Sequence, residues 1–154
     1  MLSPEEKAEI DKEVEESHTV QAACIEALKI IQRYRGWVSD DSLHELADYL
    51  GMPRDALDSV ATFYSMVFRR PVGKHVILIC DGFACWVMGY ENMLTYLKKK
   101  LGIELGETTK DGKFTLLTIP CIGSCDIAPA MVVDRETYGN LTPERIDQIL
   151  DGFK

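Results

Sequence analysis

The sequence predicts an α+β protein in which a small helical bundle precedes an α/β sandwich. Helical periodicity covers residues 1–65, and the pattern then changes to the short apolar runs that are typical of strands. Pro71 and Gly73 mark the change, since both residue types interrupt regular structure. From residue 74 on, the predicted order is β-α-β-β-α, which indicates helices packed against one small sheet.

The first sixteen residues predict a solvated, partly frayed helix. They carry seven acidic residues against two lysines, so this segment contributes −5 to the chain's net charge of −8. A charge run of this kind is typical of a solvated face. The acidic chain also has no basic run, so we expect no binding to nucleic acid, where Lys and Arg must neutralise phosphates.

Three further helices are predicted in the first half. Apolar residues recur at helix spacing over 20–31 and over 43–50. Gly51 suits the C-terminal cap of the second of these helices, because glycine reaches left-handed backbone angles without a clash. Pro53 fits the first turn of a third helix, whose apolar stripe extends over 56–64.

The second half predicts alternating strands and helices, bounded by turn residues. The expected elements, in chain order, are a buried strand over His75–Cys80, an amphipathic helix over 90–101, a strand over Phe114–Ile119, a short apolar strand over 130–133, a hairpin turn over Asp134–Thr137 and a last helix that starts at Thr142.

Four of the five cysteines form two pairs at the ends of predicted strands. Cys80 ends the first strand and Cys85 follows it, whereas Cys121 and Cys125 follow the strand over 114–119. Strand ends that lie side by side would bring both loops to one edge of the sheet, where four thiolates can converge. Such a set of thiolates favours an iron–sulfur cluster of the 2Fe–2S type.

Glycines inside the two loops fit the same cluster. Gly82 lies between the first two cysteines and Gly123 between the second two. Glycine lets backbone N–H groups approach closely. Hydrogen bonds from such groups to the sulfurs offset the negative charge of a cluster and tune its potential.

Other interpretations of the cysteines remain open at this point. Structural zinc sites usually show C-x2-C spacing, and a thioredoxin-type exchange site needs the same spacing. Neither cysteine pair of this chain has it. Two disulfides would suit a secreted protein. Uncommitted structural cysteines are a further alternative. Cys24, on the apolar stripe of a helix, is expected to be plain core.

Other polar and aromatic candidates are expected to have no role in chemistry. His18, His44 and His75 share no motif, and Asp126 suits a surface or capping role. Phe83 and Trp86, on either side of Cys85, are expected to shield a cluster or to touch a partner.

The location is expected to be cytoplasmic, without direct membrane insertion. The N-terminus lacks the apolar core of a signal peptide. The longest strongly apolar run, Val76–Cys80, is far shorter than a membrane span.

Several motifs occur in a fixed order along the chain. They are Arg35-Gly-Trp-Val38, Val60-Ala-Thr-Phe-Tyr-Ser65, Arg70-Pro-Val-Gly73, Cys80-x4-Cys85, Cys121-Ile-Gly-Ser-Cys125 and Leu141-Thr-Pro-Glu144. From about Val20 to the C-terminus, this series resembles the small 2Fe–2S subunit of the NADH dehydrogenase module of respiratory complex I, nearest to the bacterial form. Similar subunits occur in NAD-dependent and electron-bifurcating hydrogenases and in formate dehydrogenases. Residues 81–84 and 86–88 depart from the family pattern.

The resemblance implies a helical docking domain over residues 1–70 and a thioredoxin-like ferredoxin domain over 71–154. It implies that Cys80, Cys85, Cys121 and Cys125 ligate one 2Fe–2S cluster. The implied partner is a larger subunit that binds NADH and FMN, joined to this chain as a heterodimer within a multisubunit complex. The cluster would exchange single electrons with that FMN, as part of an NADH:quinone oxidoreductase peripheral to the cytoplasmic membrane.

The residues are consistent with dependence on a partner. The chain has no G-x-G-x-x-G phosphate loop, so it shows no NADH or flavin site of its own and no catalytic residue. The alternatives are the equivalent subunit of a hydrogenase or formate dehydrogenase, a free-standing ferredoxin, and a zinc-stabilised assembly adaptor.

Overall fold

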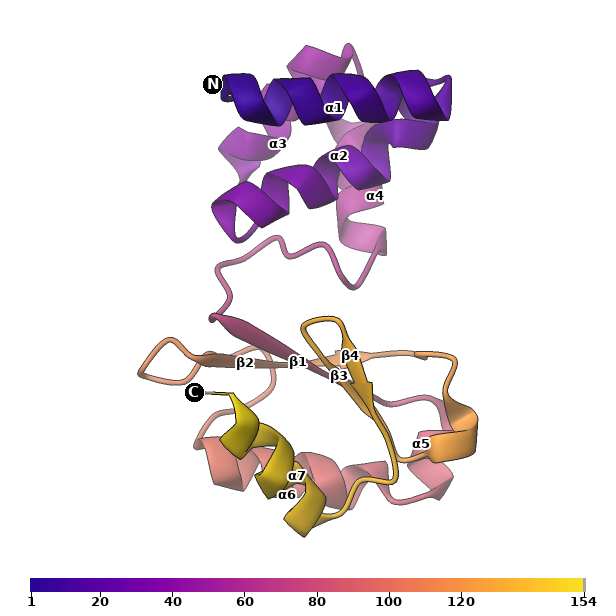
Figure 1. Cartoon of the computed structure of the whole chain (residues 1–154), viewed down its shortest axis with the longest axis vertical. Coiled ribbons are helices and arrows are strands. Elements are labelled where there is room, and N and C mark those ends of the chain that lie inside the picture. The colour runs from indigo at the N-terminus through magenta and orange to yellow at the C-terminus, as the bar shows by residue number, and fades with distance from the viewer. Residues whose placement is uncertain (154) are drawn as a thin grey trace. The chain divides into compact units, whose positions relative to one another are not determined.

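The computed structural model describes residues 1–153, which form two compact units, Met1–Pro71 and the part of the chain from Val72 on (Figure 1). The first unit contains only helices, and the second carries the sheet. The α+β class expected from the sequence is therefore confirmed. None of the helices within 1–153 combines the length and apolarity that crossing a membrane requires.

The first unit consists of helices whose ends match the capping residues of the sequence. They are α1 (Pro4–Ser17), α2 (Val20–Arg35), α3 (Asp40–Leu50) and α4 (Arg54–Phe63). The hydroxyls of Ser3, Thr19 and Ser39 accept hydrogen bonds from the first turns of α1, α2 and α3. Gly51 ends α3 at φ +65°, as its position predicted. Pro53 lies at the N-cap of α4 rather than inside its first turn.

The expectation of a solvated, frayed first helix is wrong for one face of α1. Ile10 is fully buried in the core of the first unit, and Glu6 is only 3% exposed. Glu6 is buried because Arg35 of α2 binds it through two hydrogen bonds, Nε to Oε1 at 2.7 Å and Nη2 to Oε2 at 2.8 Å. The charge run therefore describes the outer face of α1 only.

The chain that leaves α4 is held against the helical unit by two polar side chains. The Gln32 amide donates to the Met66 carbonyl at 2.9 Å and accepts from the Phe68 N–H at 2.6 Å. Arg69 Nη2 lies 2.7 Å from Asp40 Oδ1 and 3.0 Å from Asp58 Oδ1. The Gln32 contacts satisfy backbone groups of a segment that has no regular structure.

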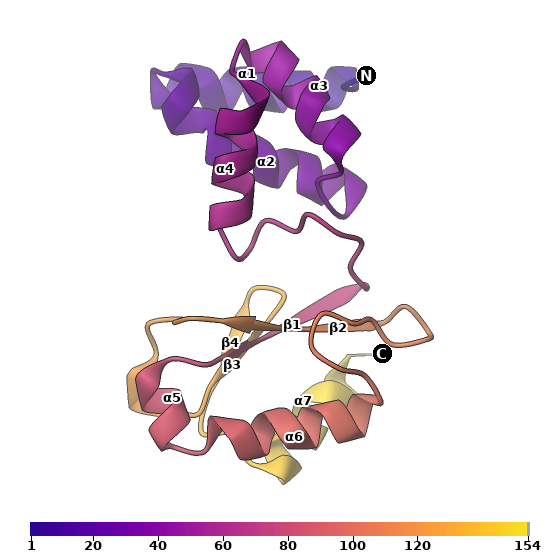
Figure 2. The same cartoon turned by 180° about the vertical axis from the view of Figure 1, so that it is seen from behind.

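The second unit is a mixed sheet with helices on one side. Its elements are β1 (His75–Cys80), α5 (Phe83–Val87), α6 (Tyr90–Leu101), β2 (Phe114–Ile119), the 3-10 turn Cys125–Ile127, β3 (Met131–Val133), β4 (Glu136–Tyr138) and α7 (Pro143–Gly152). The strand order is β2-β1-β3-β4, with β1 and β2 parallel and the other pairs antiparallel. Figures 1 and 2 show α6 and α7 on the same side of the sheet.

Two details of this unit differ from the expectation. The hairpin turn is confined to Asp134 and Arg135, so Glu136 and Thr137 belong to β4 instead of the turn. Asp134 reaches the left-handed φ of +57° that such a tight turn requires. The short helix α5 was not expected, because five residues are too few to show a periodic pattern.

Candidate metal centre

The two cysteine loops leave the sheet at one edge. β1 and β2 are parallel and in register, with Cys80 opposite Ile119 as the last pair. Cys121 follows two residues after the end of β2. The side-by-side strand ends that the sequence predicted are therefore present, and both loops start from the same end of the sheet.

The first loop buries a pair of thiols. Helix α5 begins after Gly82 and turns Cys85 inward, so that Cys80 is 3% exposed and Cys85 is 2% exposed. Ala128 and Ala130 pack against this pair, together with the half-buried Tyr90. The two buried sulfurs therefore lie among small and apolar side chains, which exclude water.

The second loop presents an exposed pair. Cys121 and Cys125 are both solvent-exposed. The Gly123 N–H between them donates to the Cys121 sulfur at 3.3 Å. Gly123 has φ +77°, a left-handed angle that a side chain would strain, and this turn directs its N–H at the sulfur.

The residues between β4 and α7 pack against the backbone that follows Cys125. The Asn140 N–H donates to the Ile127 carbonyl at 2.6 Å, and the Leu141 N–H donates to the Pro129 carbonyl at 3.0 Å. Gly139 lies so close to Ile127 that a Cβ there would be 2.4 Å from its side chain. The backbone after Cys125 is therefore held in place by close packing and hydrogen bonds.

The thiols interact electrostatically across the two loops. Burial raises the pKa of Cys85 from its ordinary 9.0 to about 11, aided by a hydrogen bond in which its thiol donates to Cys80. Negative charge on Cys125 adds to this rise, so Cys125 lies within electrostatic reach of the buried pair. Without metal, Cys85 therefore keeps its proton at neutral pH, and metal ligation must release it.

The four thiols form one buried pair and one exposed pair. Across residues 1–153, no group of three or more His, Cys, Asp or Glu side chains is arranged to hold one metal ion. A 2Fe–2S core takes two thiolates on each iron, and a structural zinc takes four ligands around one ion.

Gly82, in the first loop, lies close to the backbone of Pro120 at the start of the second loop. A Cβ on Gly82 would lie 2.7 Å from the Pro120 carbonyl oxygen and 3.4 Å from the Cys80 sulfur. Because the nearer atom belongs to the backbone, Gly82→Ala must push the loops apart, and we expect a several-fold lower iron content per chain. Gly152→Ala is the matched control, since its Cβ would meet nothing within 4 Å. Equal iron content in both variants would contradict this account.

The remaining sequence candidates belong to the helical unit or have other partners. Cys24 is buried in α2, where its thiol donates to the Gln21 carbonyl at 3.0 Å and burial raises its pKa. His75, at the opposite end of β1 from Cys80, has its Nδ1 2.7 Å from Asp134 Oδ2. His44 belongs to α3, and His18 ends α1.

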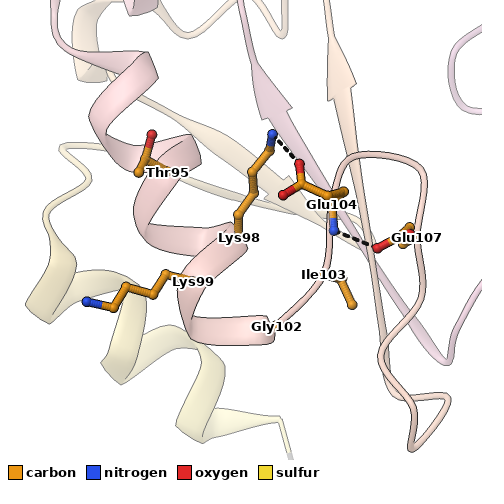
Figure 3. Close-up of a pocket in the computed structure, with 7 residues that line it drawn as sticks. All are labelled: Thr95, Lys98, Lys99, Gly102, Ile103, Glu104 and Glu107. Carbon is orange, nitrogen blue, oxygen red and sulfur yellow. Dashed lines mark hydrogen bonds and ion pairs between the residues drawn. The ribbon is translucent and has the colours of Figure 1, made fainter.

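A pocket in the second unit lies at the C-terminal end of α6 (Figure 3). Its volume is about 470 Å³, and no cysteine lines it. Lys98 Nζ lies 2.6 Å from Glu104 Oε2, and the Glu104 N–H donates to Glu107 Oε2 at 2.8 Å. These polar groups pair with one another, and the two cysteine loops remain the candidate site.

Comparisons with known proteins identify relatives of this chain. Residues 10–154 match the family model described as thioredoxin-like 2Fe-2S ferredoxin. The E subunit of NADH-quinone oxidoreductase from Escherichia coli (strain K12) is 48% identical over 153 residues, which cover 99% of this chain and 92% of that protein. The protein of the same name from Pseudomonas aeruginosa is 43% identical over the same shares of the two chains.

One solved structure shares the fold alone. The crystal structure of an air-oxidised NAD+-reducing NiFe hydrogenase matches with a TM-score of 0.68 at 23% sequence identity. The match covers 82% of this chain but only 22% of the hydrogenase chain.

Proposed function

This chain belongs to the thioredoxin-like 2Fe-2S ferredoxin family, and we propose that Cys80, Cys85, Cys121 and Cys125 are the ligands of its cluster. The observation that carries the proposal is the parallel pairing of β1 and β2, which starts both cysteine loops at one edge of the sheet. A bound 2Fe–2S cluster would supply a redox centre that takes up or releases one electron at a time.

The chain is an electron-transfer subunit of an NADH-quinone oxidoreductase. Support comes from its identity of 48% to the Escherichia coli subunit of that complex, over 99% of this chain. The likeness to the NAD+-reducing hydrogenase concerns the fold alone, so the respiratory complex is the parent that the comparisons favour.

The chain's own residues bind the cluster and control its surroundings. Cys80 and Cys85 supply thiolates from a buried site, where low dielectric strengthens every nearby charge and hydrogen bond. The Gly123 N–H stabilises negative charge on the Cys121 sulfur. The thiols at Cys121 and Cys125 leave the opposite side of the site open to solvent or to a partner.

The electron donor is a larger subunit that binds NADH and FMN. The present chain has no G-x-G-x-x-G phosphate loop, and we assign the binding of NADH and FMN to that larger subunit. The FMN of that subunit would receive the electron pair of a hydride, and the cluster held by this chain would take up one electron of the pair, leaving the other on the flavin. In this proposal the helical unit is a docking domain, and the heterodimer lies on the cytoplasmic face of the membrane as a peripheral part of the complex.

Reduction by NADH tests this function. We expect NADH to leave the anaerobically purified chain oxidised when it is alone. Addition of the flavin- and NADH-binding subunit should then allow NADH to reduce the cluster, seen as bleaching of visible absorption and a rhombic EPR signal. Reduction by NADH without the partner, or no reduction with it, would contradict the proposal.

A further inference from the structure

A second pocket of the sheet-containing unit is formed by side chains of β4 and α7, and we call it the α7 pocket. Its volume is about 500 Å³. It is lined by Tyr138, Arg145, Gln148, Ile149, Gly152 and Phe153. The four lining residues within α7 are spaced i, i+3, i+4 and i+7, so one face of the helix forms one wall of the pocket. The volume is in the range of small-molecule sites, about 300–1,000 Å³.

The apolar part of the α7 pocket is held in place by the core. Tyr138, Ile149 and Phe153 are partly buried and pack against the core of the second unit. The Phe153 ring also lies against two further rings, with its centroid 4.8 Å from that of His75 and 6.1 Å from that of Phe114. The pocket therefore has a preformed apolar surface of two aromatic rings and one aliphatic side chain, on which a flat apolar group can pack.

The polar side chains of the α7 pocket are available to a ligand. Within residues 1–153, no acidic side chain pairs with the Arg145 guanidinium, and the Arg145 hydrogen bond to Thr142 Oγ1 comes from the backbone N–H. The Gln148 amide and the Tyr138 hydroxyl likewise bind no other group in this range. The pocket at the end of α6 differs in this respect, because its polar groups pair with one another (Figure 3).

The charges at the α7 pocket favour a ligand with a single negative charge. Arg145 is the one cation among the lining residues. Glu144 and Asp151 on α7 and Glu136 on β4 are exposed, so the same elements would repel a polyanion. A guanidinium matches the planar carboxylate group, to which it can donate two parallel hydrogen bonds.

We propose that the α7 pocket binds an aromatic monocarboxylate, whose carboxylate pairs with Arg145 and whose ring packs on Tyr138 and Phe153. The site is separate from the cysteine loops, because Phe153 packs on His75, at the opposite end of β1 from Cys80. The inference therefore goes beyond the proposed electron transfer and does not rest on it.

Titration of the cluster-loaded full chain with naphthoate tests the inference, followed by the amide NMR shifts of α7 and β4. We expect saturable binding with a Kd on the order of a millimolar or below, as for other ligands of this size. Arg145→Gln should weaken the Kd on the order of tenfold, because it removes the charge-assisted hydrogen bonds. The uncharged naphthamide should bind the wild-type chain about as weakly. Arg135→Gln is the matched control, since Arg135 is exposed in the hairpin turn and does not line the pocket.

A second variant tests the location by filling the pocket. A Cβ at Gly152 would meet nothing within 4 Å, so Gly152→Leu can extend into the open space without disturbing the fold. We expect it to abolish saturable binding. An unchanged Kd in Arg145→Gln or in Gly152→Leu would overturn the inference, as would the absence of saturable binding to the wild-type chain. None of these readouts uses NADH or the flavin subunit, so failure here leaves the proposed function standing.

Discussion

Replacing Cys85 with serine is expected to abolish the 2Fe–2S cluster. Cys85 is buried beside Cys80, and in the proposed ligand set its loss leaves one iron with a single protein thiolate instead of two. Cys121→Ser should have a similar effect from the second loop. Iron and sulfide content per chain after anaerobic purification, together with visible absorption, measures the loss.

The control for this prediction is the fifth cysteine. Cys24 is equally buried but lies in α2, where its thiol donates to a backbone carbonyl. Cys24→Ser should leave iron content and the spectrum unchanged. Full iron content in Cys85→Ser, or a loss in Cys24→Ser, would show that the ligand assignment is wrong.

Replacing Glu6 with glutamine is expected to destabilise the helical unit by about 2–3 kcal/mol. Removing one partner of a buried ion pair typically costs about 3–5 kcal/mol, since it leaves the other charge without compensation. Here the loss is smaller, because the Arg35 side chain is 27% exposed and also binds Glu45 Oε2 at 3.1 Å. Chemical denaturation of the full chain, followed by far-UV circular dichroism, which the helical unit dominates, measures the change in free energy of unfolding.

The pH dependence of this effect has a defined sign. The hydrogen bonds from Arg35 hold the pKa of Glu6 below its ordinary 4.5. The contribution of Glu6 to stability is therefore complete above pH 4.5 and is lost as the pH falls through the lower folded-state value. The stability difference between the wild type and Glu6→Gln should accordingly shrink in acid.

Glu26 provides the matched control for Glu6. It forms an ion pair with Lys29 at 2.6 Å, but both side chains are about half exposed. Exposed pairs contribute only about 0–1 kcal/mol, so Glu26→Gln should have little effect at any pH. Equal destabilisation by the two substitutions would show that burial of the Glu6–Arg35 pair does not matter.

The cysteine pairs could be predicted because they depend on local patterns. The strand is recognisable from the five apolar, β-rich residues Val76–Cys80, and Cys80 is its last residue. Parallel neighbouring strands then bring their ends together, so four cysteines could be placed at one edge from the sequence alone. The positions of the main helices followed from the same kind of periodicity and from caps such as Gly51.

Features that depend on contacts between distant elements could not be predicted. Burial of Glu6 requires Arg35, twenty-nine residues away, and its position in an acidic run indicated a solvated face instead. Helix α5 is too short for periodicity, although it turns Cys85 inward and Phe83 outward. The Gly123 hydrogen bond to Cys121 depends on backbone angles that glycine permits but does not dictate.

The most direct test of the central claim is the metal content and EPR spectrum of the anaerobically purified chain. We predict a red-brown protein with about two irons and two sulfides per chain, and about one unpaired electron per chain in a rhombic signal after reduction. A colourless protein that contains one zinc per chain and gives no EPR signal on reduction would contradict the account.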